Sequence, residues 1–204
     1  GNSGKPCMWA WKKNQETGRL VVCGSHPESC TTEDVTELYQ AQISYAMDGF
    51  GNAKPKAVLE NGMKRIMGNS NDPLYAGIGD RQYHHYLIYL PKRASKLRIT
   101  LHCNLQDAHL ELAMKKDTYA FADSEPEYSG KASEDGKSGT VTLTAKKVPA
   151  GLWYVSVHCP IAPEAIYHNS TRTHQVGGYI EYTGNEAEMA TLNGIAYDIA
   201  AEWK

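Results

Sequence analysis

The sequence contains no pair of cysteines at the C-x-x-C spacing. Its five cysteines are Cys7, Cys23, Cys30, Cys103 and Cys159. Zinc ribbons and thioredoxin-like motifs both need closely spaced pairs, so neither is supported. The odd number of cysteines leaves at least one thiol unpaired in a monomer.

Long apolar runs and long basic runs are also missing. The longest apolar runs, such as 86–90, are far too short to cross a bilayer, so we predict no membrane span. The 21 lysines and arginines are nearly balanced by 23 acidic residues and are scattered in short groups. A nucleic-acid binder gathers its cations into a patch or stripe, which makes nucleic acid a poor candidate partner.

Short β-type runs with turn signals between them fill the chain from Tyr83 onward. Within one run, Leu97, Ile99 and Leu101 alternate with polar residues, which is the period-2 pattern of a half-buried strand. The runs cover 83–90, 96–103, 109–115, 140–145, 152–159, 178–182 and 196–203. We therefore predict a mainly β fold, an antiparallel β-sandwich of jelly-roll-like type.

The first fifty residues have a different pattern. Apolar runs at 7–11 and 20–23 predict a hairpin, and apolar residues at helical spacing predict a helix over 32–47. Glycine, asparagine and proline then mark a linker. The predicted organisation is an N-terminal segment over 1–50, a linker over 51–57 and the sandwich over 58–204.

Several ordered segments of the predicted sandwich resemble the bacterial pre-peptidase C-terminal domain. They are Leu59-Glu60-Asn61-Gly62, Tyr86 to Pro91, Ala94 to Leu101, Asp107 to Leu112, Pro149 to Val157 and Ala196 to Ile199. The resemblance implies a non-catalytic accessory or binding module of a larger exported bacterial protein, located in the periplasm, outside the cell or on its surface. Such a module assists substrate attachment, stability or secretion of an attached upstream catalytic domain.

The same resemblance implies no cofactor. Its expected ligand is a polysaccharide or a protein surface. A calcium-dependent or collagen-type matrix binder is a further reading, because the binding domains of collagenases resemble the same sandwich. At His109 the chain departs from the family, whose members carry an acid there.

The segment 18–28 resembles the last active-site segment of class I glutamine amidotransferase-like domains, of the biotin-ligase N-terminal type. In that family the His-Pro-Glu sequence supplies two members of a Cys-His-Glu triad, which here would be His26 and Glu28. No cysteine in the chain fits the glycine-flanked elbow of the nucleophile. The alternative function is therefore the C-terminal part of such a hydrolase, in which the N-terminal hairpin and helix are the remnant of an α/β domain. In the simpler interpretation, the segment that contains His26 and Glu28 is only a polar turn.

The tripeptides Leu101-His102-Cys103 and Val157-His158-Cys159 repeat one pattern at two strand ends. Two histidines and two cysteines could hold a metal ion, but adjacent strand residues point to opposite faces. We therefore predict no metal site, and either a Cys103–Cys159 disulfide or two buried thiols.

Tyr83, His85 and Tyr86 lie in one run of aromatic and imidazole side chains. Such side chains suit flat polar ligands, so the three are candidate binding residues for a carbohydrate or a peptide. The alternative is a strand whose tyrosines lie partly in the core.

Overall fold

The computed structural model describes residues 8–11, 19–23, 34–47, 55–68, 70, 72, 74–122, 125–132, 139–168 and 179–204. The chain divides into two compact units, one formed by 1–54 with 165–182 and the other by 55–164 with 183–204.

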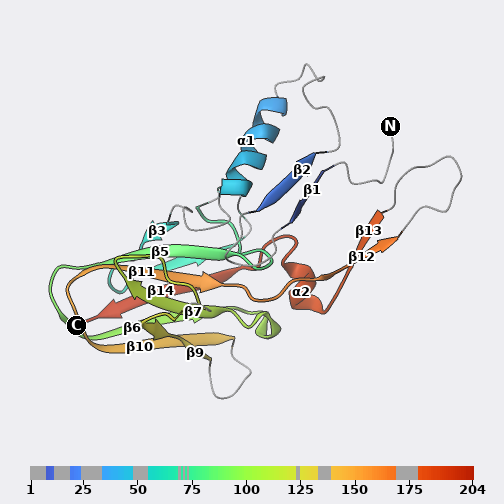
Figure 1. The fold of residues 1–204 in the computed structure, drawn as a ribbon. Helices are drawn as coiled ribbons and strands as arrows, with labels where there is room; N and C mark the ends of the chain where they lie inside the picture. Colours follow the sequence, from blue (N-terminus) through green and yellow to red (C-terminus); the bar gives the residue numbers. More distant parts are fainter. Residues whose placement is uncertain are drawn as a thin grey trace, which may run out of the picture. The chain divides into compact units, whose positions relative to one another are not determined.

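The second unit is a β-sandwich of two five-stranded sheets (Figure 1). The β6 sheet has the order β4 (Lys64–Met67), β14 (Tyr197–Trp203), β6 (Ala94–His102), β10 (Thr140–Val148) and β9 (Lys131–Ala132). The β11 sheet has the order β3 (Ala57–Val58), β5 (Tyr83–Leu90), β11 (Gly151–His158), β7 (Glu111–Lys116) and β8 (Tyr128–Ser129). All pairs are antiparallel except β3 with β5. The predicted mainly β, antiparallel sandwich is confirmed.

The alternation in the sequence decides which face of each strand is buried. Leu97, Ile99 and Leu101 of β6 are fully buried in the core, whereas Arg98 between them is exposed. β11 contributes Trp153, whose indole Nε1 donates to the carbonyl of Pro149 at 3.0 Å, so the ring is buried with its polar atom satisfied. The two inner faces together form one continuous core.

Three polar side chains cross this core. Tyr86 of β5 and Tyr197 of β14 join their hydroxyls at 2.6 Å, and His84 Nδ1 lies 2.7 Å from the Tyr197 hydroxyl. Burial raises the pKa of both phenols well above the ordinary value of 10.0, so both stay neutral. Because β5 and β14 belong to different sheets, these hydrogen bonds connect the two layers.

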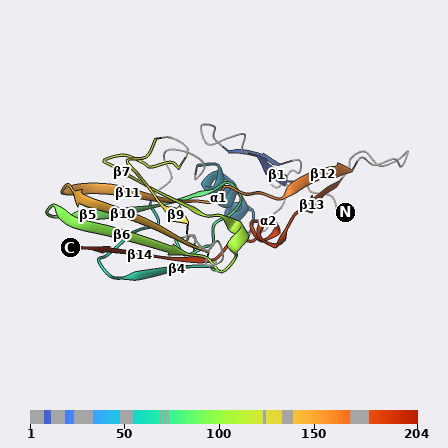
Figure 2. The ribbon, with the colours of Figure 1, turned by 90° about the horizontal axis from the view of Figure 1, so that it is seen from below.

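Asn61 connects the start of the sandwich to its last strand. Its Nδ2 donates to the carbonyl of Trp203 at 3.0 Å, and the Trp203 N–H donates to its Oδ1 at 2.9 Å. Gly62, at φ +77, adds an N–H donated to the carbonyl of Ala201 at 2.8 Å. β4 then pairs with β14, and Figure 2 shows β4, β14 and β6 as neighbours at one side of the sandwich.

The first unit contains the predicted hairpin and helix. β1 (Met8–Trp11) pairs antiparallel with β2 (Leu20–Cys23), and α1 spans Asp34–Met47. Arg19 holds β2 to α1, because its Nη1 donates to the carbonyl of Tyr45 at 3.1 Å and its guanidinium lies 4.2 Å from the Tyr45 ring centre.

One predicted sandwich strand lies elsewhere. The run at 178–182 forms β13 (Tyr179–Thr183), which pairs with β12 (Glu164–His168) in a separate two-stranded sheet. Among the side chains of these two strands that the structure describes, Glu164, Ile166, Glu181 and Tyr182 are exposed. His168 Nε2 is bound to Glu181 Oε2 at 2.7 Å across the hairpin.

Asn61→Ala should destabilise the sandwich by about 1–3 kcal/mol, because it removes two hydrogen bonds to the backbone of Trp203, each worth roughly 0.5–1.5 kcal/mol. The free energy of unfolding in urea measures this change. Glu60→Ala, at the exposed neighbouring position, is the matched control and should stay within about 0.5 kcal/mol of wild type. Equal stabilities for the two variants would contradict the bridging role of Asn61.

Candidate binding site

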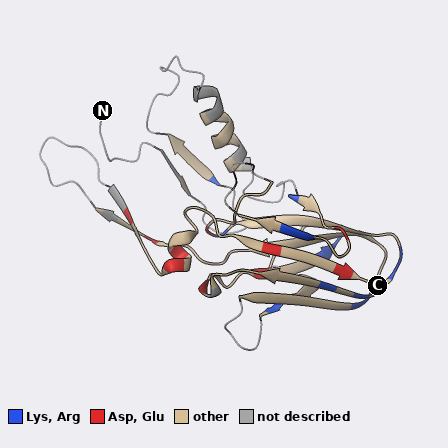
Figure 3. Ribbon diagram, turned by 180° about the vertical axis from the view of Figure 1, so that it is seen from behind, with Lys and Arg blue, Asp and Glu red and all other residues tan. Residues whose placement is uncertain are grey.

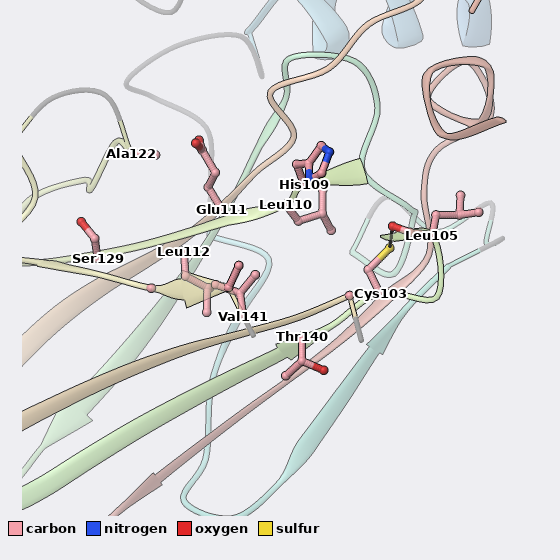
Figure 4. A pocket seen from close by; sticks show the side chains of 13 residues that line it. Cys103, Leu105, His109, Leu110, Glu111, Leu112, Ala122, Ser129, Thr140 and Val141 are labelled. Atoms are coloured by element: carbon pink, nitrogen blue, oxygen red, sulfur yellow. Dashed lines mark hydrogen bonds between the residues drawn. The ribbon is translucent and has the colours of Figure 1, made fainter. Parts of the chain in front are cut away.

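A cleft of about 390 Å³ opens at the edge of the sandwich where β7 and β10 begin (Figure 4). It lies between the two sheets, since β7 belongs to the β11 sheet and β10 to the β6 sheet. The residues that line it are Cys103, Leu105, His109, Leu110, Glu111, Leu112, Ala122, Ser129, Gly130, Ala132, Gly139, Thr140 and Val141.

Two glycines set the shape of the cleft wall. The chain crosses between the sheets at Gly130, whose N–H donates to the carbonyl of Leu112 at 2.8 Å. A Cβ at Gly130 would lie 2.7 Å from Val141 Cγ1 and 2.8 Å from Leu112 Cβ. At Gly139, with φ +56, a Cβ would collide with the carbonyl of Cys103. Larger residues at either position would force the strands apart.

The interior of the cleft is apolar and its edge is polar. Leu110, Leu112 and Val141 are buried side chains that line it. Figure 4 shows the Glu111 carboxylate and the Ser129 hydroxyl pointing away from Leu112 and Val141. An apolar hollow with a few polar groups beside it is the usual composition of a ligand site.

Glu111 also joins the cleft to a cluster on the outer face of the β11 sheet. Its Oε2 lies 2.7 Å from Nδ1 of His158, its cross-strand neighbour. The His158 ring stacks on Tyr83, with ring centres 4.1 Å apart. The carboxylate at the edge of the cleft is thus held in place by a buried imidazole.

His85 and Ser156 form a second pair in this cluster. His85 Nδ1 lies 2.8 Å from the Ser156 hydroxyl, which itself donates to the carbonyl of Ala120 at 2.6 Å. Because the single hydroxyl proton is given to Ala120, the hydroxyl accepts from His85, and the imidazole proton lies on Nδ1. In this arrangement His85 cannot take a proton from Ser156 as a general base would.

The predicted binding residues Tyr83, His85 and Tyr86 do not form an exposed platform. Their exposed fractions are 6%, 3% and 0%. Tyr86 points into the core, whereas Tyr83 and His85 share the outer face, as the alternation of a strand requires. Residues of the segment 119–122 cover that face: Phe121 packs edge-on against Tyr83 with ring centres 5.2 Å apart, and Tyr119 packs against His85 at 4.6 Å.

Cys103 and Cys159 are free, buried thiols, and no disulfide joins them. Of the two predicted arrangements, a disulfide or two buried thiols, the structure has the two buried thiols. Cys103 Sγ donates to the carbonyl of Leu105 at 3.5 Å and Cys159 Sγ to that of Ile161 at 3.8 Å. Burial raises the pKa of Cys103 and raises that of Cys159 to about 11, so both are protonated at neutral pH.

The histidines beside these cysteines have other partners. His102 binds Thr140 and Asn104, and His158 binds Glu111. Within the part of the chain that the structure describes, no three histidine, cysteine or acidic side chains gather as metal ligands.

His26 and Glu28, the predicted triad members, lie outside the described residues. Their catalytic role stays a prediction.

The cleft was missed in the sequence because its walls come from separate segments. Glu111, Ser129 and Val141 stand on three different strands, and none belongs to a recognisable motif. The available signal was Gly130 and Gly139, because a glycine within or beside a strand often marks a close approach of two chains.

No protein-family model matches the chain, and no curated protein matches it. Among solved structures, the crystal structure of the pre-peptidase C-terminal domain of collagenase from Bacillus anthracis is similar at a TM-score of 0.40 and 8% identity. The match covers 73% of this chain and 97% of that one. A likeness at this level carries no argument about function, and the fold assignment rests on the strands described above. No described helix is long and apolar enough to cross a membrane.

The buried thiols should make the fold less stable at alkaline pH. Unfolded thiols ionise from the ordinary pKa of 9.0, whereas Cys159 in the fold stays protonated up to about pH 11. The free energy of unfolding should therefore fall between pH 9 and 11. In Cys103→Ala/Cys159→Ala the fall should start nearer pH 10, from the buried tyrosines alone.

Urea unfolding of wild type and of the double variant at a series of pH values measures this dependence. An identical pH dependence in the double variant and in wild type would contradict the thiol contribution.

Proposed function

We propose that the sandwich is a non-catalytic accessory domain of a larger exported bacterial protein, and that it attaches this protein to a peptide-containing substrate through the cleft. The observation that carries the proposal is the cleft itself, about 390 Å³ in volume with an apolar interior and a polar edge. Ligand sites in proteins have volumes of roughly 300–1,000 Å³ and the same mixture of surfaces.

The chemistry of the lining favours a peptide segment with an apolar side chain. Leu110, Leu112 and Val141 suit an aliphatic or aromatic group. Ser129, at the polar edge, offers a hydroxyl that can donate to or accept from a backbone amide of the ligand. The Glu111 carboxylate is held by His158 on the outer face of the β11 sheet, so it can accept only from a part of the ligand that extends past the edge of the cleft.

The residues that carry the resemblance to pre-peptidase C-terminal domains support a scaffold role. Asn61 bonds the backbone of Trp203, and Trp153 fills the core. The one serine–histidine pair described above, His85 with Ser156, is buried and has its proton in the wrong place for nucleophilic catalysis. Each of these groups stabilises the fold.

A tryptophan at the edge of the cleft tests the binding proposal. N-acetyl-leucinamide should shift the methyl NMR signals of Leu112 and Val141 in the full chain, with a Kd on the order of millimolar for so small a ligand. Ala132→Trp should abolish these shifts by filling the opening. N-acetyl-glycinamide, which lacks the apolar side chain, should cause none.

Thr144→Trp is the matched control, because Thr144 is also exposed but lies on the outer face of the β6 sheet. This variant should bind N-acetyl-leucinamide as wild type does. Undiminished methyl shifts in Ala132→Trp, or equal shifts with N-acetyl-glycinamide, would overturn the cleft as the binding site.

The non-catalytic part of the proposal has a separate test. The full chain should release no ammonia from glutamine or related amides, and His26→Ala should not change this result. Turnover that disappears in His26→Ala would instead support the amidotransferase-like alternative. A G-x-C-x-G elbow upstream in the parent protein would point the same way, because it would supply the nucleophile.

A further inference from the structure

Three lysines lie in one row across the outer face of the β6 sheet. Lys96 of β6 is directly opposite Lys146 of β10. Lys204 follows the last residue of β14, and its N–H donates to the carbonyl of Lys96 at 3.1 Å. All three side chains are exposed. Neighbouring strands are about 4.8 Å apart, so the three ammonium groups can reach the same bound anion.

Repulsion within this row lowers the stability of the fold. Like charges that face each other across two strands are destabilising. In the described residues no carboxylate side chain forms an ion pair with Lys96, Lys146 or Lys204. An anion bound between the three ammonium groups would therefore reduce their mutual repulsion.

Further cations lie at the same end of the sandwich. Lys92 and Arg93 form the turn between β5 and β6, and Lys147 follows Lys146. Figure 3 shows the basic segments of the ribbon close to the C-terminus. Lys147 has φ +56, a left-handed conformation that costs a lysine roughly 1–2 kcal/mol. We name these six residues, Lys92, Arg93, Lys96, Lys146, Lys147 and Lys204, the basic end.

Hydroxyl groups continue from the basic end along the same face. Thr144 is opposite Arg98, the next outward residue of β6 after Lys96, and Thr142 is opposite Thr100. Arg98 is opposite Glu202 of β14. The face thus changes from three lysines to an alternation of hydroxyls with charges of both signs.

We propose that this face binds a polysaccharide that carries anionic groups. The lysine row holds a carboxylate or sulfate group, and Thr142 and Thr144 exchange hydrogen bonds with sugar hydroxyls further along the chain. The proposal concerns a different surface from the cleft and does not depend on it. It identifies the second contact by which the module would hold a composite, sugar-containing substrate.

The arrangement fits other polyanions less well. A nucleic acid carries a phosphate at every nucleotide. Glu202 and Asp198 follow the lysines on the same face, so their carboxylates would repel the neighbouring phosphates. A membrane surface would favour large apolar residues among the lysines, whereas the turns at this end read Pro91-Lys92-Arg93 and Pro149-Ala150, and the exposed Tyr89 lies on the other sheet.

The test compares two variants of the full chain with the same loss of charge. Lys96→Gln/Lys146→Gln removes two members of the row, and Lys115→Gln/Lys116→Gln removes two lysines of β7, which belongs to the other sheet. The probes are polygalacturonate, dextran sulfate, neutral dextran and a DNA duplex, measured by affinity electrophoresis. We expect wild type to bind one or both anionic polysaccharides, with the affinity lowered about tenfold in the first variant and less than twofold in the second.

Each outcome decides part of the proposal. Preference for polygalacturonate or for dextran sulfate assigns the bound group as carboxylate or sulfate. Equal binding of neutral dextran, tighter binding of DNA than of either anionic polysaccharide, or equal losses in the two variants would overturn it.

The unfolding temperature of the variants is a second measurement, because a misfolded variant would not unfold at a higher temperature than wild type. Lys96→Gln/Lys146→Gln should unfold at the same or a higher temperature than wild type, because it removes the facing like charges. Lys147→Gly should also raise the unfolding temperature, since glycine adopts φ +56 without strain, and should weaken polysaccharide binding. Lower unfolding temperatures together with unchanged binding would contradict a functional reason for these lysines.

Discussion

The structure depends on keeping the space between the two sheets free of water. Trp153, Tyr86 and the aliphatic residues of β6 meet there, and every strand must direct its apolar side chains inward to join them. The three polar groups that enter this space, His84, Tyr86 and Tyr197, satisfy one another. Once the inner faces are used in this way, all recognition has to occur at the sandwich edge or on the outer faces.

The outer face of the β11 sheet is covered by other residues, whereas the outer face of the β6 sheet is exposed. On the β11 sheet, Tyr119 and Phe121 cover Tyr83 and His85, so the aromatic and imidazole groups become part of the fold. On the β6 sheet, exposed lysines and half-buried or exposed threonines face outward. The cleft lies on neither outer face. It opens at the edge of the sandwich, where the chain crosses from one sheet to the other at Gly130. Its edge carboxylate, Glu111, is fixed by His158 of the covered face, which connects binding at the edge to packing on that face.

Sequence reasoning worked best where it depended on local periodicity. The strand that contains Leu97 was predicted with the correct inner face, and the helix that ends at Met47 was also found. It failed for β13, whose β-type residues look like those of a sandwich strand but pair with β12 in a separate two-stranded sheet. The sequence also left two interpretations of Tyr83 and His85, a binding platform or a partly buried strand, because their own segment does not reveal that residues 119–122 cover them. Asn61 was recognised through a family resemblance, yet only the structure shows that its amide bonds Trp203.

The sequence by itself determined a mainly β chain, the direction of most strand side chains and the balance of charge. The tertiary structure alone decided that Cys103 and Cys159 are separate thiols, that Glu111 stands beside His158, and that Lys96, Lys146 and Lys204 form a row. The physical reason is that the local pattern fixes which face of a strand a residue occupies, whereas strand order and register fix its neighbours. Lysines that are scattered along the chain become a patch only when β6, β10 and β14 lie side by side.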